Sequence, residues 1–304
     1  MTKVVSFINY KGGVGKTTSA YHIGCALAHF HDKKVLLVDA DPQTNLTFLC
    51  ARPERWNEFR RSNGTLEALY QNFLGEDKDG FDIDDIIWKS PVVRGESPAI
   101  PNLDLIPSTV SLLGIDLDLQ SQFTPVNDER RFARSYLRIR TVLRDALEEV
   151  KSRYDYILID CPPNLYIVTQ NALVASDAYV VSALPDHLST VGLSLLDQRI
   201  GRFGRAWHNY GETADIAVDA PKMKGIIFVR VRLGGTAVVG MHQAVMADIR
   251  REYGKVVFDA YTTEGIGYGE AAELARPVFL VNEQNAKRVS PQYIQITREF
   301  LEKI

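Results

Sequence analysis

The chain has 304 residues, about twice the length of a typical domain, and 45% of them are hydrophobic, so it can bury a sizeable core. Charged residues make up 24% and no low-complexity tract is present, which excludes a fibrous or disordered protein. Because 35 basic residues stand against 38 acidic ones, for a formal charge of -3, any nucleic-acid site has to be a local basic patch.

Apolar runs alternate with helical patterns along the chain. The predicted strands are residues 4–8, 34–38, 156–159, 178–183 and 225–229. The predicted helices are residues 17–30, 129–153, 190–203 and 292–304, the last of which we expect to pack into the core. Continuous apolar strands are typically buried on both faces of a sheet. The pattern therefore predicts the α/β class, with a doubly wound, mostly parallel sheet flanked by helices.

We expect residues 1–304 to form a single domain with two surface insertions, near residues 52–63 and 75–98. The first stretch is polar and aromatic, and the second contains six acidic residues between Glu76 and Asp85. The acidic run lacks the complete ligand pattern of an EF-hand loop, so we interpret it as a solvated surface.

The segment with the clearest chemistry is a glycine-rich turn, KGGVGKTT, between the first predicted strand and the first predicted helix. Backbone amides in such a turn point at phosphate oxygens, and the positive end of the helix adds to the attraction. Lys16 is expected to reach the terminal phosphates and the Thr17 hydroxyl to bind Mg²⁺. The ordinary pattern has glycine at the position of Tyr10, and a second lysine, Lys11, lies within this variant loop. The predicted phosphate-binding residues are Lys11, Gly12, Gly13, Val14, Gly15, Lys16, Thr17 and Thr18.

Three acidic residues lie at or just beyond the ends of predicted strands. Asp39 and Asp160 each end an apolar strand, and Asp41 follows the first of them by two residues. A nucleotide with Mg²⁺ brings dense charge that carboxylates at this edge of the sheet can organise. We predict that Asp39 and Asp160 support the metal, Asp160 through a bound water, and that Asp41 orients the attacking water.

These motifs resemble those of the ParA/MinD family of ATPases. KGGVGKTT resembles its deviant Walker A loop, VDADPQTN its switch I and YDYILIDCPP its Walker B strand. The resemblance continues in LDLIPST at residues 103–109, NALVASDAYVV at 171–181 and LSTVGLSLL at 188–196. It covers most of the chain and is closest to the ParA branch.

The resemblance implies a P-loop NTPase fold of the SIMIBI type and a Mg²⁺-dependent ATPase that is slow and stimulated by a partner. It implies that Lys11 crosses to the phosphates of a second subunit, so that ATP is sandwiched in a homodimer that hydrolysis separates. Lys11, Lys16 and Asp41 are then the catalytic residues, and ATP and Mg²⁺ the cofactors. The implied function is the positioning or partition of a plasmid, chromosome or protein cargo on nonspecifically bound DNA, with a ParB-like or other stimulating partner.

The resemblance weakens after Gly225. ParA-type chains usually carry a Pro-Arg element near the base, and the corresponding stretch here, residues 262–271, has none. The stretch FVRVR at residues 228–232 replaces the tyrosine-aspartate and following arginine usual in relatives, and the sequence assigns neither Arg230 nor Arg232 a role.

A basic surface is expected in the last third of the chain. Beyond residue 198, basic residues outnumber acidic ones, opposite to the balance of the whole chain. The candidate DNA contacts are Arg199, Arg202, Arg205, Arg250, Arg251 and Lys255. Their helical spacing allows contacts to phosphates without reading bases.

Three alternatives compete with partition. A ParA-like adaptor in secretion, conjugation or defence stays open because of the two insertions and the altered carboxyl-terminal motif. A MinD-like membrane switch needs a basic amphipathic terminal helix, and Arg298 and Lys303 are the only bases in residues 292–304, so we expect no membrane anchor. A redox enzyme resembling the nitrogenase iron protein needs cluster ligands that Cys161 alone does not supply.

The location is predicted from the cysteines and the apolar runs. Three widely spaced cysteines without a CxxC pair argue against a disulfide framework and favour the cytoplasm. No run approaches the roughly 18 apolar residues of a membrane span. We therefore expect a cytoplasmic protein that is associated with the nucleoid if it binds DNA.

Overall fold

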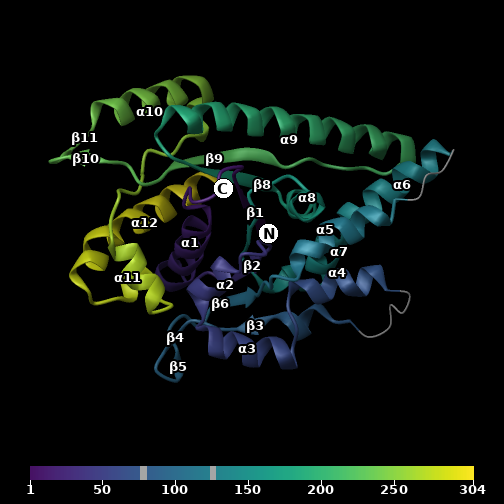
Figure 1. Ribbon diagram of the computed structural model, residues 1–304, viewed down its shortest axis with the longest axis horizontal. Helices are drawn as coiled ribbons and strands as arrows, with labels where there is room; N and C mark the ends of the chain where they lie inside the picture. The colour runs from purple at the N-terminus through teal and green to yellow at the C-terminus, as the bar shows by residue number, and fades with distance from the viewer. Residues whose placement is uncertain (76–80, 124–127) are drawn as a thin grey trace.

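The computed structural model describes residues 1–75, 81–123 and 128–304 (Figure 1). In this part of the chain, seven strands form one sheet in the order β3-β6-β2-β7-β1-β8-β9. They are β1 (Lys3–Ile8), β2 (Val35–Asp39), β3 (Trp88–Lys89), β6 (Leu103–Ile106), β7 (Tyr156–Asp160), β8 (Ala178–Ala183) and β9 (Lys222–Phe228). All neighbours pair in parallel except β3, which runs antiparallel to β6. The α/β class and the mostly parallel sheet predicted from the sequence are confirmed.

Two small hairpins lie outside the sheet. They are formed by β4 (Val93–Arg94) with β5 (Ser97–Pro98) and by β10 (Leu233–Gly234) with β11 (Ala237–Val238).

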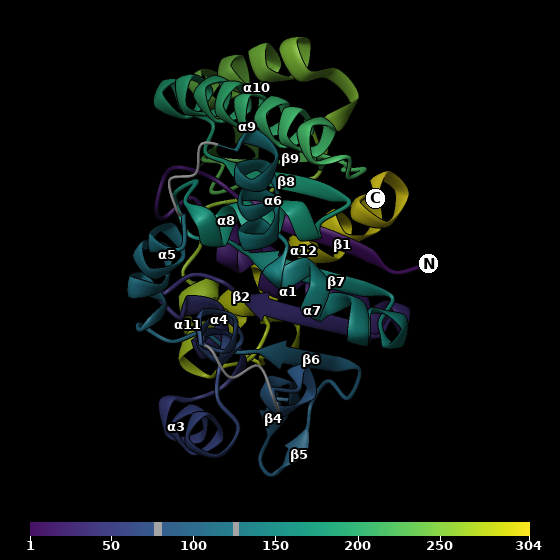
Figure 2. The ribbon, with the colours of Figure 1, turned by 90° about the vertical axis from the view of Figure 1, so that its right-hand side faces the viewer.

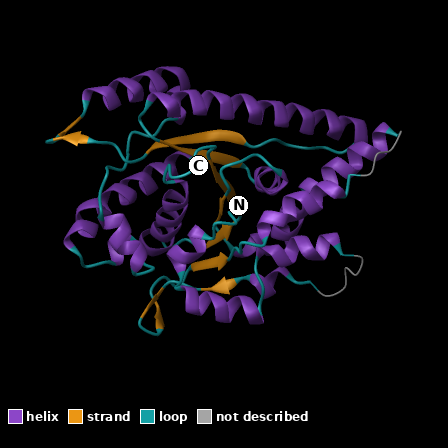
Figure 3. Ribbon diagram, viewed as in Figure 1, coloured by secondary structure: helices purple, strands orange, loops and turns teal. Residues whose placement is uncertain are grey.

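Helices cover both faces of the sheet (Figure 3). One face packs against α1 (Lys16–His31), α2 (Asn45–Cys50), α3 (Pro53–Ser62) and α12 (Gln284–Lys303). The other packs against α4 (Leu66–Leu74), α5 (Leu112–Ser121), α6 (Glu129–Arg140), α7 (Val142–Val150), α8 (Ile167–Ala175), α9 (His187–Ala214) and α10 (Gly240–Tyr253). The remaining helical elements are α11 (Gly267–Glu273), η1 (Ile83–Ile86), η2 (Lys151–Arg153), η3 (Gly254–Val256) and η4 (Val278–Leu280).

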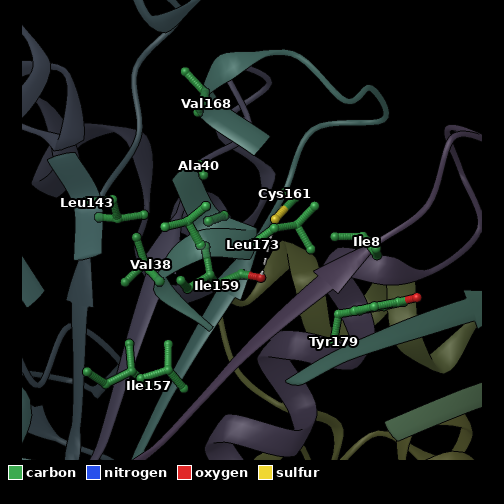
Figure 4. Close-up of a cluster of buried hydrophobic side chains, with 14 of the residues drawn as sticks. Ile8, Val38, Ala40, Leu143, Ile157, Ile159, Cys161, Val168, Leu173 and Tyr179 are labelled. Atoms are coloured by element: carbon green, nitrogen blue, oxygen red, sulfur yellow. Dashed lines mark hydrogen bonds between the residues drawn. The ribbon is translucent and has the colours of Figure 1, made fainter. Parts of the chain in front are cut away.

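Successive side chains of a strand point to opposite faces of the sheet, and this alternation divides the core into two layers. Val4 and Ile8 of β1 face the layer under α4 to α10, whereas Val5 and Phe7 face α1 and α12. Figure 4 shows the first layer, where Val38, Ile157 and Ile159 of the central strands meet Leu143 of α7 and Leu173 of α8. Burial on both faces explains why these strands read as continuous apolar runs.

Several predicted helices differ from the observed ones in length. The helix expected at residues 129–153 breaks at Thr141 into α6 and α7, and the one expected at 190–203 is part of the longer α9. The last helix packs into the core as predicted, with Tyr293, Ile296 and Phe300 at most 1% exposed. Within the described ranges, no helix has the length and apolarity needed to cross a bilayer.

The two stretches expected to be insertions form local structure at one end of the molecule. Residues 52–63 contain α3, at the end opposite α9 and α10 (Figures 1 and 2). Residues 76–80 lie outside the described residues, and with them part of the acidic run. Trp88 and Lys89 pair with β6 and form the edge strand β3, so this part of the second stretch belongs to the sheet.

Candidate nucleotide-binding site

The sheet register brings the predicted acidic residues to one edge. Asp39 at the end of β2 pairs with Asp160 at the end of β7, and Asp160 also pairs with Phe7 of β1. The glycine-rich loop follows β1 directly, so it begins beside both carboxylates. Ligand sites of open α/β sheets lie at this carboxyl edge.

The loop has a backbone that only glycine adopts readily. Gly13 and Gly15 have φ angles of 74° and 69°, in the left-handed region. A Cβ at Gly15 would also lie 3.3 Å from a methyl carbon of Val229. Asn9 braces the loop, because its Oδ1 accepts a hydrogen bond from the Lys11 amide and its Nδ2 donates to the Ser182 carbonyl. Asn9 thereby ties the start of the loop to β8, ahead of the amino end of α1, where backbone amides commonly bind anions.

The loop forms one wall of a cavity of about 1100 Å³. Val229 and Arg230, just beyond β9, also line it, together with residues 262–266 and Tyr268, and Val229 lies beside Gly15 of the loop. The cavity also contains Asp41 and the α2 residues Phe48 and Leu49. Its volume is at the upper end of the range for small-molecule sites and suits a nucleotide.

Lys16 lies between two carboxylates at the floor of the cavity. Its Nζ atom is 3.2 Å from Oδ1 of Asp160 and 3.8 Å from Oδ2 of Asp41, and Lys16 is only 6% exposed. Burial lowers the pKa of Lys16, but the charges of Asp160 and Asp41 more than offset this, so that its pKa is raised. Lys16 therefore stays protonated and is held where a polyphosphate would meet it.

Asp160 keeps one free carboxylate oxygen. Its side chain is fully buried, and Oδ2 has no hydrogen-bond partner among the described residues. Burial raises the pKa of this carboxyl, while the charge of Lys16 and the Thr17 hydroxyl oppose the rise. A buried oxygen without a partner beside a threonine hydroxyl is a fit for hydrated Mg²⁺.

Magnesium would need ligands from outside the chain. In the ranges that the structure describes, no group of three or more His, Cys, Asp or Glu side chains is arranged to hold a metal ion. Mg²⁺ in phosphate sites usually takes one or two protein ligands and fills its octahedron with phosphate oxygens and waters. The Thr17 and Asp160 pair fits that pattern.

Asp39 is tied into the protein by hydrogen bonds. Its Oδ2 accepts from the amide and the hydroxyl of Thr47, at 2.8 and 2.7 Å, and its Oδ1 accepts from the Asp41 amide at 3.2 Å. Burial and the charge of Asp160 raise the pKa of Asp39 to about 8, against the lowering effect of the Thr47 hydrogen bonds. These bonds account for its position, and its metal role stays a prediction.

Asp41 is fixed through its backbone by residues that the sequence predictions did not include. Ser108 donates its hydroxyl to the Asp41 carbonyl at 2.7 Å and its amide to the Thr47 hydroxyl at 3.0 Å. The Gln43 amide donates to Oδ1 of Asp41, so Oδ2 faces Lys16. Ser108 could have been found from the sequence, because it lies in the 103–109 motif that resembles the family. No motif or spacing in the sequence pointed to Thr47.

Lys11 points to a different carboxylate. Its Nζ lies 3.4 Å from Oδ2 of Asp186, which caps α9 by accepting from the Ser189 amide. Lys11 is 43% exposed at its side chain, so it is accessible to a second molecule. No pattern in the sequence pointed to Asp186, since a lone acid before a helix usually acts only as a cap.

The six candidate DNA contacts divide between two adjacent helices. Arg199, Arg202 and Arg205 are exposed on α9, and Arg199 lies over the Tyr10 ring. Arg251 is exposed in the last turn of α10 and Lys255 in η3, which follows it; α10 lies next to α9 at one end of the molecule (Figures 1 and 2). Arg250 is half-buried and donates to the Phe258 carbonyl, which gives it a structural contact.

A lysine buried between strand-end carboxylates beneath a glycine loop is the arrangement of a P-loop nucleoside triphosphatase. Comparison with known proteins agrees, because a family model described as an AAA domain matches residues 2–210. The chromosome partitioning protein ParA of Caulobacter vibrioides is 30% identical over 308 residues, covering 98% of this chain and 94% of that protein. The sporulation initiation inhibitor protein Soj of Bacillus subtilis is 28% identical, covering 98% of each chain. The chain belongs to the ParA/Soj family of partition-type ATPases.

Solved structures share the fold. An ATP complex of a McdA variant from Cyanothece superimposes with a TM-score of 0.69 at 20% identity, over 100% of this chain and 97% of that one. Cobyrinic acid a,c-diamide synthase from Mycobacterium smegmatis, with an ATP analogue and magnesium, gives a TM-score of 0.65 at 20% identity, over 99% of this chain and 95% of that one.

Proposed function

We propose that the protein is a partition ATPase whose ATP-dependent sandwich dimer binds DNA nonspecifically and positions a plasmid, chromosome or protein cargo. A ParB-like or other partner stimulates hydrolysis. The observation that carries the proposal is the placement of two lysines on one loop. Lys16 is buried between Asp160 and Asp41, whereas Lys11 is accessible at the rim. One lysine thus serves the nucleotide of its own chain, and the other is free to serve that of a partner.

Within one chain, each group has a distinct task. Lys16 and the amides of residues 12–18 would hold the phosphates, and Thr17 with Asp160 would hold Mg²⁺. When bound, Mg²⁺ neutralises charge that develops on the phosphates. Asp41, held by Ser108 and Gln43, presents a carboxylate oxygen that positions water for hydrolysis. Asp39 keeps the segment before α2 in place through Thr47.

Dimerisation explains how a weakly basic surface holds DNA. Two copies of the α9 and α10 surface double the number of phosphates neutralised, which raises affinity and salt dependence together.

The proposal also covers the location and organisation of the chain. It would act in the cytoplasm, on nucleoid DNA, as a single ATPase domain of residues 1–304.

Sedimentation of the Asp41→Ala variant tests the proposal. With ATP and Mg²⁺ we expect a stable dimer, and with ADP a monomer, because the variant binds ATP without orienting water. Added duplex DNA should co-sediment only with the ATP form, and binding should weaken steeply with salt. A monomer with ATP, or binding that salt does not change, would contradict the proposal.

A matched pair of variants locates the DNA surface. Arg202→Ala with Arg205→Ala removes two exposed arginines of α9, and DNA binding should fall while dimerisation stays intact. Arg61→Ala removes an exposed arginine of α3, at the opposite end of the molecule, and should change neither (Figure 1).

A further inference from the structure

The cavity lining includes one of the two arginines that follow β9. Val229, Arg230 and residues 262–266 line the cavity together with the glycine-rich loop. Arg232, two residues further on, does not line the cavity. The structure therefore separates the two arginines that the sequence left without a role.

The backbone fixes the position of Arg230. Its φ of 54° places it in the left-handed region, which is rare for a residue with a side chain. Its amide donates to the Thr262 hydroxyl at 3.2 Å, and the next amide, of Val231, donates to the Thr262 carbonyl at 2.8 Å. Strained backbone that the surroundings hold in place often marks a binding residue.

The neighbouring segment is held by α12. Gln292 donates to the Thr263 hydroxyl at 2.7 Å, and its Oε1 accepts from the Thr263 amide and the Tyr268 hydroxyl, both at 2.9 Å. These hydrogen bonds hold the cavity-lining residues beside Arg230 in a fixed arrangement.

Glu264 holds the guanidinium group of Arg230 loosely. Its Oε1 is 3.6 Å from Arg230, whereas its Oε2 is 3.0 Å from Arg232. Arg230 is 56% exposed at its side chain, and exposed ion pairs of this kind are weak. Arg230 can therefore leave Glu264 at little cost, while Arg232 still neutralises the carboxylate.

We propose that Arg230 is a nucleoside-binding residue, whose guanidinium group leaves Glu264 and lies against the purine base of the bound nucleotide. The inference rests on the proposed nucleotide binding. Lys16 fixes the phosphate end at the floor of the cavity, so the nucleoside end lies against the rest of the lining, which includes Arg230. A planar guanidinium group can stack on the face of an aromatic ring or donate hydrogen bonds to acceptor atoms at the edge of the ring.

Calorimetric titration of variants with MgADP and with magnesium pyrophosphate tests this inference. Arg230→Asn removes the guanidinium group and retains a residue that tolerates the left-handed backbone. We expect its affinity for ADP to fall about tenfold, or about 1.4 kcal/mol. Its affinity for pyrophosphate should not change, because pyrophosphate has no nucleoside part.

One further variant serves as the control. Arg232→Ala removes the other arginine at Glu264, which does not line the cavity, and should not weaken ADP binding. Unchanged ADP affinity in Arg230→Asn, an equal loss for pyrophosphate, or an equal loss in Arg232→Ala would overturn the inference. A parental chain that binds neither ligand would overturn the proposed function as well, whereas parental binding with an unaffected Arg230→Asn would overturn the inference alone.

Discussion

The ammonium group of Lys11 lies 3.4 Å from the carboxylate of Asp186, so the accessible lysine of the glycine-rich loop is paired with the residue that caps α9 within its own chain. Both side chains are more than a third exposed. The pair is therefore weak and does not by itself hold the loop. It does compete with any contact that Lys11 makes to another molecule.

Variants of this pair should shift dimerisation in opposite directions. Lys11→Ala should retain ATP binding in the single chain but dimerise poorly, because the lysine that reaches the second nucleotide is missing. Asp186→Asn keeps an oxygen that caps α9 and removes the competing charge, so it should dimerise at a lower protein concentration. Sedimentation with ATP measures both, in the Asp41→Ala background. Equal dimerisation of the two variants would count against the role of Lys11.

Removal of Lys16 should abolish useful nucleotide binding. Hydrogen bonds to charged groups contribute about 1.5–3 kcal/mol, so we expect Lys16→Ala to lose about a hundredfold in ATP affinity. Fluorescence titration with a labelled nucleotide gives the affinity. Lys3→Ala, which removes an exposed lysine at the other end of β1, is the matched control and should bind normally. Parental affinity in Lys16→Ala would remove the basis for the phosphate site.

The hydrogen bonds of Thr47 should stabilise the fold. Thr47→Val keeps the shape but deletes the bond to Asp39 and leaves the Ser108 amide without its acceptor. A buried donor without a partner costs about 1–3 kcal/mol, which urea unfolding should detect as a lower free energy of unfolding. Thr213→Val changes an exposed threonine of α9 and should stay within about 0.5 kcal/mol of the parent. A loss as small in Thr47→Val would show that this network is not important for stability.

His22 should make the protein less stable in acid. Its Nδ1 bonds to the Thr18 carbonyl and its Nε2 accepts from the Val278 amide, so the buried ring is neutral. Burial lowers the pKa of His22 to about 4, from 6.5 in the unfolded chain. The unfolded chain then binds the extra proton between these values. The contribution of the neutral His22 ring to the free energy of unfolding is complete above about pH 6.5. It falls by up to about 3 kcal/mol as the pH is lowered toward 4.

Urea unfolding at several pH values isolates the contribution of His22. His22→Gln should show a shallower loss of stability between pH 6.5 and pH 4 than the parent, whereas the exposed His208→Gln should follow the parent. Asp39, with its pKa raised to about 8, has the opposite sign and loses its contribution as the pH rises toward 8. Because Asp39 is present in the parent and in both variants, its effect is the same in all of them and cancels when their stabilities are compared. Identical slopes for His22→Gln and the parent would refute the prediction.

The central strands and the site at their ends could be predicted because the same physics determines both. Strands buried on both faces are apolar throughout, so residues 34–38 and 156–159 were visible, and the polar Asp39 and Asp160 marked where they end. The break at Thr141 was not visible, because apolar spacing continues across it. β3 was also missed, since a strand of two residues is too short to show an alternation of apolar and polar side chains.

Positioning residues escaped prediction because their partners are distant in sequence. Thr47 matters through Asp39 and Ser108, and the Ser108 amide bonds to a side chain 61 residues away. The Gln292 contact with Thr263 spans 29 residues. Local pattern has no access to such pairs, whereas the glycine loop carries its whole chemistry in eight consecutive residues.

Both margins of the central sheet are protected in part. At one margin, β3 is two residues long and Trp88 is stacked on Phe59 of α3. At the other, Ile226 of β9 bridges to Val257. Exposed backbone at a sheet margin is a template for aggregation. The short edge strand and the bridge therefore reduce the strand backbone with which another copy of this chain could pair.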